Sequence, residues 1–259
     1  MRRGHAEAAG GVPRDLRAPT VVIAHGAWID ATGWREVIAL LQIKGVNVVA
    51  VQNPLSSLAD DVDAVSRAIN QLSGPIVLVG HGYGGTVITQ AGNHSGVAAL
   101  VYVAAFAPDF GESTMDSQIE YPPQASVARL EVDSGGFLYL AQESVPQFLA
   151  QDLPATDNLV LAAAQQPIRA SALLDRVALA AWRVKPCWYV VTSEDRMISP
   201  ALQRQLAARM NARVCILSAS HTPFLSKPKE TANVILAAVD FVRGNGQAGE
   251  SIAEPSDGA

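Results

Sequence analysis

The stretch Val77-Leu78-Val79-Gly80-His81-Gly82-Tyr83-Gly84-Gly85-Thr86 decides the fold. An apolar, β-branched run enters a glycine-rich turn and leaves into a helix-like segment that reaches Asn93. β-Branched residues favour a strand, and glycine permits a tight turn with close backbone approach. The stretch therefore predicts a buried strand, a sharp turn and a helix, in that order.

Strand, sharp turn and helix is the context of the motif G-x-S-x-G, in which a serine on a strained turn presents its oxygen above the sheet. Gly80 and Gly84 occupy the two glycine positions, but Gly82 stands where the motif has serine. Glycine has no side-chain oxygen, so no acyl-enzyme can form at this position. The stretch therefore indicates the fold and leaves the reaction open.

Strands and helices alternate on both sides of this stretch. Runs of apolar residues predict buried strands over residues 20–24, 46–51, 75–79, 97–104, 187–192 and 214–217. Apolar residues at helical spacing predict helices over residues 34–41, 58–72, 199–210 and 226–242. Ser57 and Asp60 form a capping box at the start of the second helix. This alternation predicts an α/β fold with a doubly wound, mostly parallel sheet and helices on both faces.

The alternation stops between residues 108 and 184. Prolines and glycines interrupt this part of the chain, and its helix-like pieces, at 145–150 and 156–165, are short. An insertion of this size between sheet strands predicts a cap over the active face. We therefore expect a core of residues 19–107 and 185–243, a cap insertion of residues 108–184, and flexible tails at 1–18 and 244–259.

Composition limits the class of protein. The chain has 259 residues, 49% of them hydrophobic, and a net charge of −5 without a basic block, which argues against nucleic acid as a partner. No apolar core follows Arg2 and Arg3, so we expect no signal peptide, and the apolar run 97–107 is too short to span a bilayer. Cys187 and Cys215 lie in apolar runs, which favours buried, reduced thiols in a cytoplasmic protein. We expect no metal, cofactor or membrane partner; monomer and homodimer both stay open.

Four short motifs at predicted strand ends carry a resemblance to a known family. They are His25-Gly26-Ala27-Trp28, residues 80–85, Ser193-Glu194-Asp195 and Ser220-His221-Thr222-Pro223. With them the chain resembles a bacterial α/β-hydrolase related to the branch that holds plant methyl esterases and hydroxynitrile lyases, over residues 20–243. Each motif is weak alone, whereas four in the right order are specific. The family's chain order is nucleophile, acid, histidine, which Gly82, Asp195 and His221 keep.

The resemblance implies a role for several residues. His221 would be the general base, and Asp195, with Glu194 as its neighbouring competitor, would hold the histidine in the right tautomer. The backbone N–H groups of Ala27 and Tyr83 would form an oxyanion hole, which depends on turn geometry and not on the missing serine.

The substrate pocket is expected at the strand ends beneath the cap, where open α/β sheets bind ligands. We expect Trp28, His25, Phe224 and Tyr139 around it, and a small-molecule substrate of modest, apolar or aromatic character. His25 and His81 are also expected to have structural roles beside the oxyanion loop and the turn. The predicted reaction is hydrolysis of a small carboxylic ester or related acyl compound, with activity weakened or lost through Gly82.

Glycine at position 82 leaves three explanations open. The chain is an inactivated serine hydrolase, or a natural member of the fold that binds a ligand without hydrolysing it, or a protein in which His221 activates a water in the vacated space. A lyase or cofactor-free oxygenase that uses the His221–Asp195 pair as base is a further alternative. Similar hydroxynitrile lyases carry lysine directly after the catalytic histidine, and Thr222 in that place disfavours cyanohydrin chemistry.

The turn also matches the dinucleotide-binding pattern G-x-G-x-x-G, at Gly80, Gly82 and Gly85. Such a site needs an acidic residue at the end of the next strand, and that strand ends Ala104-Ala105-Phe106. The turn also follows the third predicted strand and not the first. Nucleotide binding is therefore disfavoured.

Overall fold

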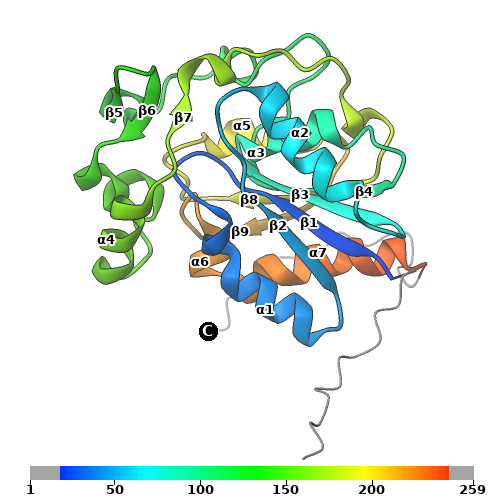
Figure 1. The fold of residues 1–259 in the computed structure, drawn as a ribbon. Coiled ribbons are helices and arrows are strands. Elements are labelled where there is room, and N and C mark those ends of the chain that lie inside the picture. Colours follow the sequence, from blue (N-terminus) through cyan, green and yellow to red (C-terminus); the bar gives the residue numbers. More distant parts are fainter. Residues whose placement is uncertain (1–17, 245–259) are drawn as a thin grey trace, which may run out of the picture.

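A six-stranded parallel sheet forms the centre of the molecule (Figure 1). The computed structural model describes residues 18–244, so the predicted tails lie almost wholly outside the described residues. The strand order is β2-β1-β3-β4-β8-β9. The strands are β1 (Thr20–Ala24), β2 (Asn47–Val51), β3 (Ile76–Gly82), β4 (Val97–Ala105), β8 (Cys187–Thr192) and β9 (Arg213–Leu217).

Helices cover both faces of this sheet, as Figure 1 shows. One face packs against α2 (Leu58–Ile69), α3 (Gly84–Ala91) and α5 (Pro200–Arg209), and the other against α1 (Arg35–Ile43) and α7 (Pro228–Val242). Successive strand residues enter opposite cores: Val22 joins the first, and Val21 and Ile23 join the second. Two-sided burial explains why the strands read as continuous apolar runs. No helix in residues 18–244 is both long and apolar enough to cross a membrane.

The predicted doubly wound α/β fold is confirmed, with shifts at element ends. The third strand continues to Gly82, three residues past its predicted end at 79, because the glycine-rich turn still pairs with β4. The second helix ends at Ile69, three residues short of the predicted 72. Its predicted start is correct, with Ser57 Oγ accepting the N–H of Asp60 at 3.1 Å.

The segment between β4 and β8 forms a smaller, separate layer. Figure 1 shows its second sheet and α4 (Ala155–Ala164) to one side of the main sheet. The second sheet is antiparallel and consists of β5 (Leu130–Val132), β6 (Phe137–Leu140) and β7 (Ile168–Arg169). The short helical turns of the chain are η1 (Ala31–Trp34), η2 (Asp116–Gln118), η3 (Ala125–Arg129), η4 (Gln142–Ser144), η5 (Val145–Leu149), η6 (Ala170–Leu173), η7 (Ala181–Arg183) and α6 (Pro223–Ser226).

Strand order places two loops side by side at one end of the sheet. β1 pairs with β2 on one side and with β3 on the other, so the chain reverses its direction of winding at β1. Ala24 is opposite Gly80, and the loops that follow β1 and β3 leave the sheet next to each other. Such a reversal point is where open α/β sheets form ligand sites.

Glycines let the turn after β3 pack directly on backbone. A side-chain carbon on Gly84 would lie 2.3 Å from the carbonyl oxygen of Ala24 and 2.8 Å from that of His25. One on Gly85 would lie 2.1 Å from the carbonyl oxygen of Phe106. The first turn of α3 is therefore fixed against both neighbouring loops by contacts that only glycine permits.

A buried carboxyl group joins α2 to the preceding loop. Asp61 is fully buried, and its Oδ1 accepts the N–H of Leu55 at 2.8 Å. Leu55 has a φ of +56°, a left-handed conformation that is uncommon for a residue with a side chain. Burial raises the pKa of Asp61 to about 6, so this carboxylate is held ionised at neutral pH against a desolvation cost.

Gly84→Ala should destabilise the protein by more than about 3 kcal/mol, because the new methyl group meets backbone oxygens that cannot move separately from β1. Gly96→Ala is the matched control, since the nearest atom to its added carbon is a His94 side-chain nitrogen at 3.3 Å. Urea unfolding of both variants measures the difference. Equal, small losses in the two variants would contradict the packing described for the turn.

Asp61→Asn should stabilise the protein at pH 8 by roughly 1–3 kcal/mol, because the amide keeps the acceptor for Leu55 and removes the buried charge. A raised pKa means that the folded state takes up the proton more readily than the unfolded chain. Stability from Asp61 is therefore present near pH 4 and lost as the pH rises through about 6. Urea unfolding at pH 4.5 and pH 8 should give a clear gain only at the higher pH. Asp63→Asn, on the exposed side of α2, is the control and should change little.

Candidate active site

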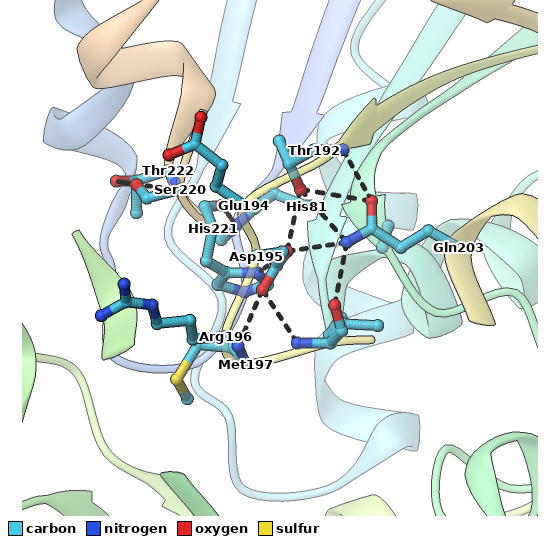
Figure 2. A network of polar contacts seen from close by, with 12 residues as sticks. His81, Thr192, Glu194, Asp195, Arg196, Met197, Gln203, Ser220, His221 and Thr222 are labelled. Carbon is cyan, nitrogen blue, oxygen red and sulfur yellow. Dashed lines mark hydrogen bonds and ion pairs between the residues drawn. The ribbon is translucent and has the colours of Figure 1, made fainter. Parts of the chain in front are cut away.

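His221 and Asp195 form a buried pair after two neighbouring strands (Figure 2). His221 Nδ1 donates to Asp195 Oδ2 at 2.8 Å, and both side chains are almost completely buried. Asp195 follows β8 and His221 follows β9, so the parallel pairing of these strands brings the residues together across 26 positions of sequence. Because Nδ1 carries the donated proton, Nε2 keeps a free lone pair, and no described residue bonds to it.

The Asp195 carboxylate is oriented by four further donors. Oδ1 accepts the backbone N–H groups of Met197 and Ile198, at 2.8 and 2.9 Å. Oδ2 accepts the Thr192 hydroxyl at 2.9 Å and the Gln203 side-chain amide at 2.8 Å. Figure 2 shows these groups converging on the carboxylate. A carboxylate with this many donors keeps a fixed direction toward the imidazole.

Thr192 and Gln203 were not identified from the sequence. Thr192 is the last residue of β8, and Gln203 lies next to the apolar stripe of α5. In the sequence, a glutamine on an otherwise apolar helix face indicates a buried polar contact, and Gln203 is fully buried. Only the structure shows which group it contacts.

Glu194, the neighbouring competitor for the acid position, points elsewhere. Its carboxylate accepts the Ser218 hydroxyl, and its backbone N–H donates to Ala219. The structure therefore brings Asp195, and not Glu194, to the histidine.

Gly82 lies directly below the free nitrogen of His221. Its φ is +53°, and a side-chain carbon built on it would lie 3.2 Å from His221 Nε2 and 3.7 Å from Cε1. A hydroxyl one bond beyond that carbon would be within hydrogen-bonding reach of Nε2. The turn thus retains the geometry of a nucleophile position without the nucleophile.

The backbone N–H groups of Ala27 and Tyr83 are free to bind a ligand. Neither donates a hydrogen bond to another described residue. The carbonyl oxygen of Gly82 accepts the N–H of Phe106 at 3.0 Å, so the planar trans peptide directs the N–H of Tyr83 the opposite way. Ala27, Tyr83, Gly82 and His221 all line one cavity.

This cavity is small and mostly apolar. Its volume is about 180 Å³, and its walls include Trp28, Phe106, Met115, Leu138, Leu173 and Met197. Four of these, Phe106, Met115, Leu138 and Leu173, come from the segment between β4 and β8. That segment therefore forms part of the wall opposite the sheet.

Of the four residues expected around the pocket, Trp28 alone is among those described around the cavity. Trp28 lines the cavity, with a φ of +62° and its indole N–H donated to the carbonyl oxygen of Leu138 at 3.1 Å. Phe224 lies behind the site, stacked on Trp34 with ring centroids 4.3 Å apart. Tyr139 is half-buried in β6 and is not among the residues described around the cavity.

His25 and His81 are buried supports for the loops of the site. His25 Nδ1 donates to the carbonyl oxygen of Gly26 at 2.9 Å, and its Nε2 accepts the N–H of Asn53 at 3.0 Å. His81 Nε2 donates to the carbonyl oxygen of His221 at 2.9 Å. Burial lowers the pKa of both imidazoles, so both are neutral, as these contacts require.

Comparison with known proteins agrees with this geometry. The model of the alpha/beta hydrolase family matches residues 21–234. A putative chloroplastic methylesterase of Arabidopsis thaliana is 26% identical over 253 residues, which cover 86% of this chain and 64% of that protein.

Two solved structures show the same fold. Polyneuridine aldehyde esterase has a TM-score of 0.76 and 18% identity, covering 86% of this chain and all of the other. Tomato methylketone synthase I, in complex with beta-ketoheptanoate, has a TM-score of 0.73 and 16% identity, covering 87% of this chain and 99% of the other. The fold, the order of the site residues and the family match over most of the chain agree: this protein belongs to the alpha/beta hydrolase family.

Proposed function

We propose that this protein hydrolyses small apolar or aromatic carboxylic esters, or related acyl compounds, with His221 activating a water molecule directly. The observation that carries the proposal is the position of His221 Nε2, which is free and lies 3.2 Å from where a side-chain carbon on Gly82 would be. Gly82 leaves room there for a water that the imidazole can deprotonate. The position of Asp195 supports the proposal, because it fixes the tautomer that makes Nε2 the base.

The proposed reaction is a single displacement. The water oxygen attacks the acyl carbon while Nε2 of His221 takes the water proton, and the carbonyl electrons move to oxygen. The N–H groups of Ala27 and Tyr83 stabilise that oxyanion. On collapse the carbon–oxygen bond to the alcohol breaks, the leaving alkoxide takes the proton from His221, and an acid and an alcohol are released.

Turnover by this route is expected to be slow. No covalent intermediate divides the reaction into two easier steps. Elsewhere, residual catalysis of about 10³- to 10⁴-fold over water survives the loss of one member of a triad, through the oxyanion hole and binding alone. A retained oxyanion hole and a retained base therefore support weak hydrolysis.

The cavity supports the substrate class. A volume of about 180 Å³ lies below the usual range of roughly 300–1,000 Å³ for drug-sized ligands, which favours a small acyl group. The side chains of Trp28, Phe106 and Leu138 offer apolar contact, and the described residues around the cavity include no aspartate, glutamate, lysine or arginine. Long charged esters are not expected to be substrates.

Gly82→Ser and Gly82→Ala form the matched pair that tests the mechanism. Both add a carbon at the same left-handed position, but only serine adds a nucleophile, and the alanine methyl group occupies the space proposed for water. On short p-nitrophenyl esters, Gly82→Ser should raise kcat/KM by at least about 10²-fold and give a burst. Gly82→Ala should fall below the original chain, and His221→Ala should abolish turnover in every background.

Other outcomes separate the explanations. Turnover by Gly82→Ser alone would identify the present chain as an inactive or ligand-binding form of a serine hydrolase. Tight binding of an ester or its acid without turnover, measured by calorimetry, would favour the ligand-binding function. Activity of Gly82→Ala equal to that of the original chain would contradict water attack in the space above Gly82.

A second candidate is a lyase, and the observation that favours it is Gly82 itself. Loss of carbon dioxide from a β-keto acid needs no nucleophile. The bond between the α-carbon and the carboxylate carbon breaks, its electrons form an enolate, and the α-carbon later takes a proton. The donors at Ala27 and Tyr83 would stabilise the enolate oxygen, and protonated His221 would supply the proton. A structural neighbour that binds beta-ketoheptanoate makes this acid the probe to use.

Release of the methyl ketone from beta-ketoheptanoate, followed by chromatography, tests the lyase. If the lyase is the function, Gly82→Ser leaves ketone formation unchanged or lower, because a serine adds nothing to this reaction. If hydrolysis is the function, ketone forms at the uncatalysed rate. Gly82→Ser should therefore raise ester hydrolysis if the protein is a hydrolase, and should not raise ketone formation if it is a lyase.

A further inference from the structure

A buried pair of polar groups lies directly behind the proposed oxyanion hole. Asp61 Oδ2 and the hydroxyl of Tyr83 are both buried, and neither has a hydrogen-bond partner among residues 18–244. The two groups are near enough that each affects the ionisation of the other: Tyr83 favours the Asp61 carboxylate, and Asp61 raises the pKa of Tyr83. For two unpartnered groups in a dry site, each is the natural partner of the other.

Tyr83 also lines the cavity, and its N–H is one of the two proposed oxyanion donors. The peptide that joins it to Gly82 is held at its carbonyl end by the N–H of Phe106. Gly82 has no side chain to restrict the rotation of that peptide. The direction of the Tyr83 N–H is therefore set at one end of the peptide by the Phe106 contact and at the other end by how firmly Tyr83 itself is held.

The loop before α2 links this pair to the second donor. Leu55 N–H donates to Asp61 Oδ1, and Asn53 N–H, two residues earlier, donates to His25 Nε2. His25 in turn donates to the carbonyl oxygen of Gly26, the residue before Ala27. The loop of residues 53–55 thus contacts both Asp61, which lies near Tyr83, and His25, which holds the loop of Ala27.

We propose that Asp61 is a positioning residue for the oxyanion hole: its ionised carboxylate anchors the Tyr83 hydroxyl and so fixes the N–H of Tyr83 toward the reacting oxygen. Asp61 does not touch substrate. This role rests on the proposed function, because the donor matters only if an oxyanion forms in the cavity.

If Asp61 has this role, replacing it should change stability and activity in opposite directions. An ionised carboxylate held in a dry site at neutral pH costs stability, so its neutral isostere should give a more stable protein. If Asp61 also anchors Tyr83, the same substitution should give a slower enzyme. A residue with a merely structural role would not change the two properties in opposite directions.

The test compares Asp61→Asn, Tyr83→Phe and the double variant, each in the Gly82→Ser background on a p-nitrophenyl ester. Each single variant should lower kcat about fivefold to tenfold while KM changes less than about twofold, because the lost contact acts on the transition state. The double variant should be much less slow than the product of the two single effects predicts, since both substitutions act on one contact. Asp63→Asn is the matched control and should keep the parent kcat.

A second measurement does not depend on activity. In the original chain at pH 8, Tyr83→Phe should lower the urea midpoint, because it leaves the carboxylate without its donor. In the Asp61→Asn background the same substitution should lower the midpoint much less, because a neutral amide makes a weaker contact with the hydroxyl than a buried carboxylate does. Equal shifts in both backgrounds would overturn the contact.

The two measurements separate this proposal from the proposed function. If Gly82→Ser is inactive but the midpoints are coupled, hydrolysis fails as the function and the anchoring contact stands without a catalytic role. If Gly82→Ser is active while kcat is unchanged in Asp61→Asn, or only KM rises, the positioning role is wrong and hydrolysis stands.

Discussion

The close approach of backbone to backbone around the turn after β3 is the constraint on which the rest of the structure depends. Gly84 and Gly85 contact the carbonyl oxygens of Ala24 and Phe106 at distances that exclude any side chain. These contacts fix the start of α3 against the ends of β1 and β4, and so fix the loops that follow those strands. Gly82 lies at this turn and Ala27 on the loop after β1, so their positions follow from the same contacts.

The site also requires that the His221 ring keeps a fixed orientation. His221 is held from three sides: by Asp195 at Nδ1, by His81 at its own carbonyl oxygen, and by the packing of the His81 ring, whose centroid is 4.5 Å away. The Asp195 carboxylate is itself fixed by backbone and side-chain donors from the loop after β8 and from α5. Because every partner is buried, solvent does not compete for these hydrogen bonds, and the arrangement persists although position 82 has nothing for it to activate.

The parts of this structure that follow from local pattern were predictable, and those that follow from packing were not. Apolar runs identified all six strands of the main sheet, since strands buried on both faces need apolar residues throughout. The pairing of His221 with Asp195 was implied by the resemblance to a known family, which rests on four motifs at strand ends. The segment between β4 and β8 was predicted as a cap insertion with helix-like pieces at 145–150 and 156–165, close to η5 and α4. Its second sheet was not predicted, because its strands are too short to show a sustained periodicity. Phe224 was expected in the pocket and instead stacks on Trp34, since an aromatic residue near a site looks the same in sequence whether it faces inward or away. The partners of Asp61 and Gln203 were invisible for the same reason.

The left-handed conformation of Gly82 persists without any side chain that requires it. In a nucleophile elbow that conformation is a strain carried by the serine, whereas here the neighbouring contacts impose it on a residue that adopts it freely. The neighbouring contacts, and not the residue at position 82, therefore set the shape of the turn. A substitution at position 82 would change the chemistry that the site can carry out and leave the supporting backbone in place.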